Sequence, residues 1–426
     1  MFEIREKPQK VERAFLVGIQ FQDQTEERAQ ELLHELEELS DTFGVKTVGS
    51  IIVKLSKSQA RFLCGTGKTA EIIEKCREVD ADVIIFDEAL TPSQQRNWER
   101  ETKNILVIDR REIILDIFAD RATTKEANLQ IELARAEYDL PRLARAWTHL
   151  SRQRGATMQR GEGERQLELD RRMIRKRIQQ LHQELKKVRK QRATQRKQRR
   201  KRPVPNAAIV GYTNAGKSSL LNLLTHSEVL ADDKLFATLD PTTRKIELSN
   251  NQPLLLTDTV GFIRKLPHDL VEAFKATLEE AVLADFLIHV IDASNEDAEE
   301  HIIATNTVLS ELGADKKRTI TIFNKIDKVE DQRVLTRLRS LIPDSHFISV
   351  KDTSGIDRLI KDMEDILEED LDQTELEIPA ERYDIIALLH RTSHIFEEEF
   401  KGNTVNIRAS VPANIHGQIK SFIVTA

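Results

Sequence analysis

The segment GYTNAGKS, residues Gly211–Ser218, decides the fold. It follows the apolar run AAIV at 207–210 and precedes the helix-forming SLLNLL, which is the strand, glycine loop and helix order of a phosphate-binding loop. Gly211 and Gly216 allow backbone N–H groups to close around phosphates. Lys217 can reach the outer phosphates, and Ser218 offers its hydroxyl to Mg2+. The segment predicts an α/β nucleotide-binding domain.

A second segment, GTGKT at Gly65–Thr69, ends in the same way but fails the same test. The position of the first glycine is taken by Phe62, and the preceding SKSQARFLC is a poor strand. A turn before a helix is therefore favoured over a second nucleotide site.

The base is indicated by NKID, Asn324–Asp327, which follows the apolar strand TITIF. Asp327 can accept hydrogen bonds from guanine N1 and the exocyclic amine, a pair of donors that adenine lacks. Lys325 would lie along the base, and Asn324 would tie this loop to the phosphate loop or to the base. The segment SVK, Ser349–Lys351, would meet the guanine carbonyl with a backbone N–H, so GTP is favoured over ATP.

Between these segments, DTVG at Asp258–Gly261 ends the apolar strand PLLLT. Asp258 would hold a magnesium-bound water, and the Gly261 N–H would contact the terminal phosphate. Thr238 is our first choice for a second hydroxyl on Mg2+, with Thr242 and Thr243 as alternatives.

Phe262 stands where many GTPases have a glutamine that orients the attacking water. A phenyl ring can neither donate nor accept for that task, so we expect slow intrinsic hydrolysis that depends on a partner. His268, after Pro267, is either a substitute polar group or a structural residue at a helix start.

The predicted nucleotide site comprises five short segments. They are Gly211, Tyr212, Thr213, Asn214, Ala215, Gly216, Lys217, Ser218 and Ser219; Phe236, Ala237, Thr238, Leu239 and Asp240; Asp258, Thr259, Val260 and Gly261; Asn324, Lys325, Ile326 and Asp327; and Ser349, Val350 and Lys351. Among them, Lys217, Thr238 and Gly261 are expected to act in catalysis, and Ser218 and Thr238 to bind Mg2+.

Charge is concentrated in one segment. Residues 171–202 hold sixteen Lys or Arg and one acid, a net +15, so the other 394 residues carry −21 within a total of −6. An apolar heptad seam also runs through this segment, at Ile174, Ile178, Leu181, Leu185 and Val188. We expect an antiparallel helical hairpin with the pattern at 127–150, whose cationic faces bind RNA phosphates. The last part, QRATQRKQRRKR, could instead be a simple linker.

Length, cysteine content and apolar segments indicate the domain organisation and the cellular compartment. The chain of 426 residues is long enough for several domains: an N-terminal α/β domain at 1–122, the basic hairpin at 123–203, the GTPase domain at 204–371 and a small α+β domain at 372–426. The first has strands expected near 14–20, 51–53, 82–87 and 106–109, with helices at 26–39 and 69–76. With two cysteines, no signal-like N-terminus and no long apolar run, we expect a cytoplasmic protein without a membrane segment.

Taken with these motifs, RGEGERQLELDRR at Arg160–Arg172 resembles the HflX family of ribosome-associated GTPases, related to the Obg group. The resemblance runs from about Phe15 through the GTPase domain and is weakest after Glu375. It implies binding of GTP or GDP with Mg2+, binding of the large ribosomal subunit and its rRNA through the hairpin, GTP hydrolysis stimulated by that subunit, and splitting of stalled or idle ribosomes. It also implies that Phe262 is the family's usual apolar residue, and we expect a monomer.

The hairpin tip departs from the family pattern RGPGETQLE. Glu162 replaces the proline, Arg165 replaces the threonine, and ATMQ occupies 156–159. A second function remains open from the residues alone, namely a GTP-dependent RNA-binding or remodelling factor that acts on another RNA.

Overall fold

The computed structural model describes residues 11–103, 105–143, 160–199, 204–225, 235–249, 252–265, 278, 280–369, 372–411 and 415–424. These residues form two compact units. The first holds most of the chain up to Lys186 together with Phe236, and the second holds the remainder. The predicted hairpin tip at 156–159 and His268 lie outside the described residues.

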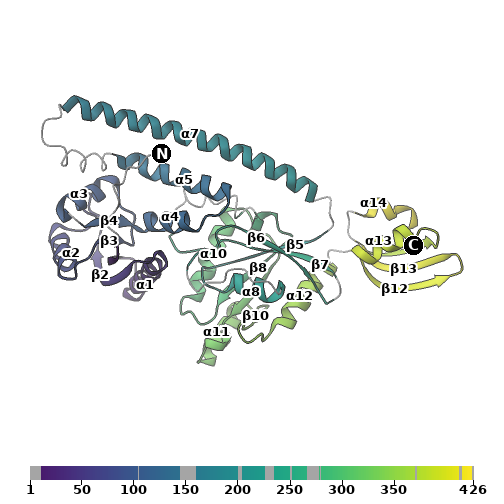
Figure 1. Ribbon diagram of the computed structural model, residues 1–426. Helices are drawn as coiled ribbons and strands as arrows, with labels where there is room; N and C mark the ends of the chain where they lie inside the picture. The colour runs from purple at the N-terminus through teal and green to yellow at the C-terminus, as the bar shows by residue number, and fades with distance from the viewer. Residues whose placement is uncertain are drawn as a thin grey trace. The chain divides into compact units, whose positions relative to one another are not determined.

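The first unit is built on a parallel sheet of four strands in the order β2-β1-β3-β4 (Figure 1). Strands β1 and β3 are buried along most of their length, as expected for parallel strands covered on both faces. The strands are β1 (Arg13–Phe21), β2 (Lys46–Leu55), β3 (Val83–Phe86) and β4 (Leu106–Asp109).

Four helices connect or follow these strands, and two of them were not predicted from the sequence. They are α1 (Glu26–Phe43), α2 (Thr66–Glu78), α3 (Pro92–Thr102) and α4 (Arg110–Arg121). Helix α3, one of the two, begins with a capping box in which Thr91 and Gln94 satisfy each other's backbone N–H groups. Helix α4, the other, buries residues on nearly all sides, so it lacks the polar face that marks a surface helix.

The segment GTGKT forms the start of helix α2, not a loop around a ligand. Gly65 is the N-cap, and Phe62 is buried, with its ring edge-on to Trp98 at a centroid distance of 5.9 Å. The Lys68 ammonium donates to Glu71 at 2.8 Å. The lysine is thus directed along its own helix, which agrees with a structural role for this segment.

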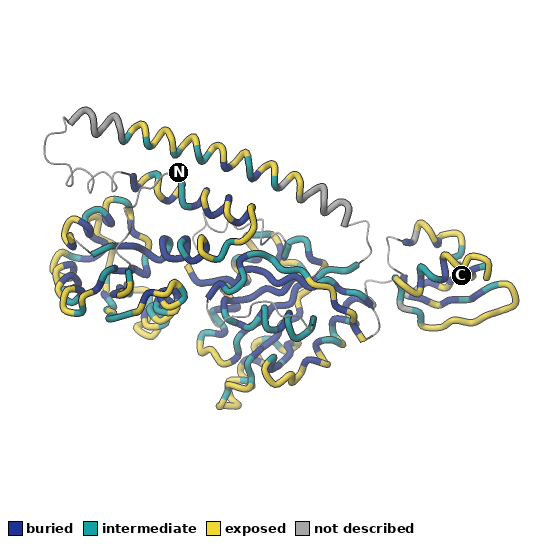
Figure 2. Tube along the Cα trace, in the orientation of Figure 1, coloured by how far each residue is buried: buried dark blue, intermediate teal, exposed yellow. Residues whose placement is uncertain are grey.

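Helices α5 (Lys125–Asp139) and α7 (Arg160–Arg199) are the arms of the basic hairpin, and the short helix η1 (Leu140–Arg142) follows α5. The predicted seam faces inward, since Leu181 and Leu185 are buried while most cations of α7 that are described remain exposed (Figure 2). Arg177 forms two hydrogen bonds with Glu132, each 2.8 Å long.

Apolar packing, not the surface ion pair, is expected to hold the two arms together. The substitution Leu181→Ala should lower the free energy of unfolding by about 3 kcal/mol, because it leaves a cavity at a fully buried position. Arg177→Ala should cost less than about 1 kcal/mol, because the Arg177–Glu132 pair is exposed to solvent. Urea denaturation followed by circular dichroism measures both, and equal losses would contradict the expectation.

The second unit contains a six-stranded sheet in the order β10-β9-β8-β5-β7-β6, in which only β6 is antiparallel to its neighbour. The strands are β5 (Asn206–Gly211), β6 (Thr242–Glu247), β7 (Pro253–Asp258), β8 (Phe286–Asp292), β9 (Thr319–Asn324) and β10 (His346–Phe347). The helices are α8 (Lys217–Thr225), α10 (Ala298–Glu311), η2 (Ile326–Lys328), α11 (Gln332–Leu341) and α12 (Ile356–Glu369). The parallel strands carry the predicted motifs at their carboxyl ends, where open α/β sheets bind ligands.

A separate sheet of three antiparallel strands follows, in the order β11-β13-β12. Its elements are β11 (Asp372–Pro379), α13 (Tyr383–Thr392), β12 (His394–Lys401), β13 (Thr404–Val411), α14 (His416–Ile419) and η3 (Lys420–Phe422). It has its own apolar core, which includes Leu389, Val405 and Ile407, and this confirms the predicted α+β character of the tail. Within the described residues, no helix combines the length and apolar character needed to cross a membrane.

Candidate nucleotide-binding site

The loop between β5 and α8 can be built only with glycine at two positions. Gly211 and Gly216 have φ angles of +145° and +95°, which disfavour other residues. A Cβ atom on Gly211 would lie 2.1 Å from the Val290 carbonyl oxygen, and one on Gly216 would lie 2.3 Å from Asn324 Nδ2. The loop therefore packs against β8 and β9 at close range and leaves its N–H groups for an anion.

Lys217 opens helix α8 and is buried. Its Nζ donates to the Tyr212 carbonyl oxygen at 2.7 Å. Burial lowers the pKa of Lys217 to about 8, and the Asp258 carboxylate opposes this shift. A buried cation with one neutral partner is well suited to phosphate oxygens, which would supply the missing negative charge.

Three oxygen-bearing side chains meet beside Lys217. The Ser218 hydroxyl donates to Asp258 Oδ2 at 2.7 Å and lies 2.8 Å from Thr238 Oγ1. Burial raises the pKa of Asp258, while Lys217 and the Ser218 hydrogen bond oppose the shift. The other oxygen, Asp258 Oδ1, is buried without a hydrogen-bond partner among the described residues. Hydroxyl and carboxylate oxygens around such an orphaned atom fit Mg2+. Of the three threonines considered, the structure places Thr238 here, whereas Thr242 and Thr243 belong to strand β6.

The DTVG segment is attached to the phosphate loop by its backbone. The Phe262 N–H donates to the Gly211 carbonyl at 3.1 Å, and the Thr213 N–H donates to the Phe262 carbonyl at 2.8 Å. A Cβ on Gly261 would lie 2.7 Å from Thr213 Cγ2, so glycine is required where the segment passes the loop. The Phe262 ring is fully buried. It is therefore a core residue in this structure and offers no group to a water molecule.

The segments predicted to bind guanine meet at the far end of the same loop. Asn324 Nδ2 donates to the Ala215 carbonyl at 2.9 Å, and the Val350 N–H donates to Asn324 Oδ1 at 3.1 Å. Asn324 thus ties three segments together, including the phosphate loop. Lys325 Nζ donates to the Asn214 carbonyl at 2.6 Å.

Asp327 is exposed and therefore accessible to a base. Its Oδ1 accepts a hydrogen bond from the Ser349 hydroxyl at 2.7 Å, and this bond lowers the pKa of the carboxyl group. The other oxygen, Oδ2, would face the two N–H donors of guanine as a fully ionised acceptor.

Most of the remaining predicted residues lie in the same loops, but two have structural roles. Thr259 donates its hydroxyl to the Ile209 carbonyl at 2.7 Å inside the sheet. The Phe236 ring is buried in the first unit against Phe118, edge-on at a centroid distance of 4.6 Å. Burial among apolar residues stabilises the ring in this position. The other predicted residues lie beside those already described. Ser219 is in α8, Ala237, Leu239 and Asp240 flank Thr238, Val260 precedes Gly261, Ile326 begins η2, and Lys351 follows Val350.

Sequence reasoning missed two neighbours of the site. Asp292, the last residue of β8, pairs with Lys325 Nζ at 2.7 Å. His301 of α10 stacks on Tyr212, with ring centroids 3.6 Å apart and planes at 7°. Asp292 had a visible signal, since it ends an apolar parallel strand as Asp258 does. The stacking of His301 depends on tertiary structure and left no sequence signal.

His289 of β8 is expected to make the protein sensitive to acid. It is buried, its Nε2 has no hydrogen-bond partner among the described residues, and burial, with Lys217 adding to it, lowers its pKa from 6.5 to about 4. The unfolded chain binds a proton between these two pH values and the folded chain does not, so stability falls as pH falls from 6.5 to 4. His289→Leu should reduce the difference in the free energy of unfolding between pH 7 and pH 4 by about 3 kcal/mol. Urea denaturation at the two pH values measures this difference. His34→Leu, at an exposed position, is the control and should change nothing.

Comparisons with known proteins show what this chain is similar to. Three families match, described as GTP-binding GTPase N-terminal at residues 30–119, GTP-binding GTPase Middle Region at 121–199 and 50S ribosome-binding GTPase at 206–325. A protein called GTPase HflX from Akkermansia muciniphila is 49% identical over 99% of both chains. GTPase HflX of Escherichia coli K12 is 44% identical over 87% of this chain and 86% of its own. A GTP-binding protein from Sulfolobus solfataricus, solved in complex with GDP, is 27% identical with a TM-score of 0.45, over 83% of this chain and 98% of its own.

Proposed function

Because this chain belongs to the HflX family of GTPases, we propose that it binds the large ribosomal subunit, hydrolyses GTP slowly until that subunit stimulates it, and dissociates stalled or idle ribosomes. The observation that supports the proposal is that one chain holds both the predicted nucleotide-site residues, brought together by the fold, and a strongly cationic helix. The GTPase activity itself follows from the family and from the GTPase domain.

We assign the nucleotide contacts from the positions of the side chains. Lys217 neutralises the outer phosphates, and the Gly261 N–H contacts the terminal phosphate. Ser218 and Thr238 hold Mg2+, with Asp258 orienting them. The ion, when bound, neutralises charge that develops on the phosphate oxygens. The carboxylate of Asp327 selects guanine.

Slow hydrolysis is supported by the burial of Phe262. The attacking water lacks an orienting group from this position, because the ring is packed in the core and its backbone is engaged with Gly211 and Thr213. A partner that reorganises this segment or supplies a polar group would then raise the rate, as in other GTPases activated in trans.

Binding to ribosomal RNA is supported by the exposed cations of helix α7, which include Arg171, Arg172, Arg175 and Lys176. No aromatic side chain accompanies them for base stacking, so they would read the phosphate backbone without sequence preference.

Co-sedimentation with purified large subunits tests the proposal. The full chain should pellet with the subunit when loaded with a non-hydrolysable GTP analogue and much less with GDP, and subunits should raise GTP turnover by at least ~10-fold. Replacing Arg171, Arg172, Arg175 and Lys176 by Gln should abolish both effects, whereas the same change at Lys46, Lys57, Lys125 and Lys316, which are exposed elsewhere, should not.

A competition experiment distinguishes this proposal from the alternative function, a GTP-dependent factor that acts on another RNA. Non-ribosomal duplex RNA that displaces the subunit at equal phosphate concentration, together with no subunit-stimulated turnover, would favour a factor acting on another RNA. Sucrose gradients of intact ribosomes incubated with the protein and GTP test dissociation directly. An undiminished intact-ribosome peak would remove that part of the proposal.

A further inference from the structure

The three-stranded sheet at the end of the chain has one open edge. Strand β13 lies in the middle, and the Leu376–Ile423 bridge partly covers β11. No strand among the described residues pairs with the outer edge of β12. A bulge at Ile395/Glu397 interrupts the start of β12, and Glu397–Lys401 then continues in regular register. This regular stretch can accept a further strand through its backbone.

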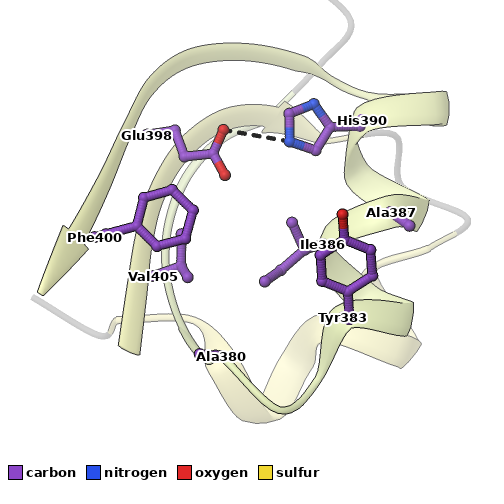
Figure 3. Close-up of a pocket in the computed structure, with 8 residues that line it drawn as sticks. All are labelled: Ala380, Tyr383, Ile386, Ala387, His390, Glu398, Phe400 and Val405. Carbon is purple, nitrogen blue, oxygen red and sulfur yellow. Dashed lines mark ion pairs between the residues drawn. The ribbon is translucent and has the colours of Figure 1, made fainter. Parts of the chain in front are cut away.

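An apolar pocket adjoins this edge on the face of the sheet that helix α13 covers in part (Figure 3). Its volume is about 140 Å³, close to that of engineered cavities of roughly 150 Å³ that hold benzene. Tyr383 and Ile386 line it from α13, and Phe400 lines it from β12. Tyr383 and Phe400 lie on opposite sides of the pocket and are 75% and 71% exposed, which is unusual for two large side chains that line one apolar pocket. The pocket is therefore large enough for one aliphatic or aromatic side chain from a partner.

The edge strand is also acidic. It contains Glu397, Glu398 and Glu399 in succession. Because side chains alternate along a strand, Glu398 lies on the pocket face with Phe400, where it pairs with His390 at 3.3 Å, and Glu397 and Glu399 lie on the opposite face. Glu399 pairs with Lys401 at 2.7 Å, but both groups are highly exposed, so this pair is weak and easily exchanged.

These charges decide which occupant fits. A second copy of the chain that added its own β12 would bring two runs of glutamates together, and like charges opposite each other destabilise a sheet. An RNA strand would meet the same repulsion from its phosphates. An extended peptide with apolar side chains on one face and Lys or Arg on the other satisfies the pocket, the acids and the open backbone together.

We propose that the β12 edge and its adjoining pocket bind an extended, cationic segment of a partner protein. The segment adds a fourth strand beside Glu397–Lys401, places one apolar side chain between Tyr383 and Phe400, and directs alternate Lys or Arg residues toward Glu397 and Glu399. The interaction is separate from the nucleotide site and does not depend on the proposed ribosomal function.

Fluorescence anisotropy of the full chain with labelled seven-residue peptides tests the proposal. The alternating peptide Lys-Leu-Lys-Phe-Lys-Val-Lys should bind saturably. Its affinity should be at least tenfold higher than that of each of three control peptides. The first has the same composition without the alternation, the second has every Lys replaced by Glu, and the third is N-methylated at alternate backbone positions. On binding, hydrogen exchange should slow at the backbone amides of 394–401.

Charge reversal provides the decisive control. The double variant Glu397→Lys with Glu399→Lys should lower the affinity for the Lys peptide at least tenfold and raise the affinity for the Glu peptide. The control variant Glu74→Lys with Glu78→Lys, at exposed positions of α2, should change neither affinity. Ala387→Leu, which fills the pocket from α13, should weaken the Lys peptide with no loss of thermal stability. Equal binding of the alternating and non-alternating peptides, no saturable binding, or no exchange of preference on charge reversal would overturn the proposal. So would a concentration-dependent dimer that protects 394–401.

Discussion

Asp327→Asn should lower the affinity for GDP and GTP by about 10²–10³-fold and create affinity for the xanthosine nucleotides. Guanine offers two N–H donors to the carboxylate, and each hydrogen bond to a charged acceptor contributes about 1.5–3 kcal/mol. Asparagine keeps an oxygen for the Ser349 hydroxyl, which now lies 2.7 Å from Asp327 Oδ1, and turns its N–H2 toward the base. There it repels the guanine amine and pairs with the carbonyl that xanthine has at the same position.

Calorimetric titration with GDP and xanthosine diphosphate measures this exchange of specificity. Asp331→Asn is the matched control, because Asp331 is close to Asp327 in the chain and its side chain caps helix α11 by accepting the Arg333 N–H. If Asp327→Asn loses affinity for GDP and gains no affinity for xanthosine diphosphate, the substitution has only damaged the loop. Unchanged GDP affinity would remove Asp327 from the site.

Lys217→Met should reduce kcat/KM for GTP by about 10³-fold or more, because a single preorganised group that meets developing charge contributes roughly 10²–10³ and Lys217 also binds the ground state. The same variant should be more stable than the parent. Burial lowers the pKa of Lys217 from 10.5 to about 8, so at pH 7 the folded protein holds a charge at a cost of about 3 kcal/mol relative to the unfolded chain. Methionine has a similar length and removes that cost.

The two results must be measured together. Single-turnover hydrolysis and urea denaturation at pH 7 should give an inactive enzyme with a higher free energy of unfolding. Lys75→Met, in helix α2 with a half-exposed side chain, should affect neither quantity. Loss of both activity and stability would mean that Lys217 supports the fold and would contradict the assigned role.

The nucleotide site could be predicted because its chemistry follows the chain locally. Gly211 ends strand β5, Lys217 opens the helix that follows it, and Asp327 lies in the short helix after β9. Parallel strands bring these carboxyl ends to one edge of the sheet. Thr238 is the first choice from the sequence, but the pattern leaves Thr242 and Thr243 as alternatives. The fold places Thr238 beside Ser218.

Helix α4 and the pocket beside β12 show where sequence reasoning reached its limit. Ile113, Ile114 and Leu115 are all buried, so α4 presents no alternation of apolar and polar faces from which a helix can be recognised. The pocket joins Tyr383, Ile386 and Phe400 from different elements, and such a contact depends on tertiary packing. The packing of the Phe236 ring on Phe118 also depends on tertiary structure, since a position in a predicted nucleotide-binding segment does not reveal which way a side chain packs.

The two glycine–lysine segments differ in how much variation they can accept. A Cβ atom on Gly211 would collide with the main chain of β8, whereas a Cβ atom on Gly67 would meet no atom within 4 Å outside its own helix backbone and chain neighbours. Position 67 can therefore accept a side chain without a collision, and alanine there would favour helix α2. Mutational drift can erase the apparent duplication of the motif while it leaves only glycine acceptable at position 211.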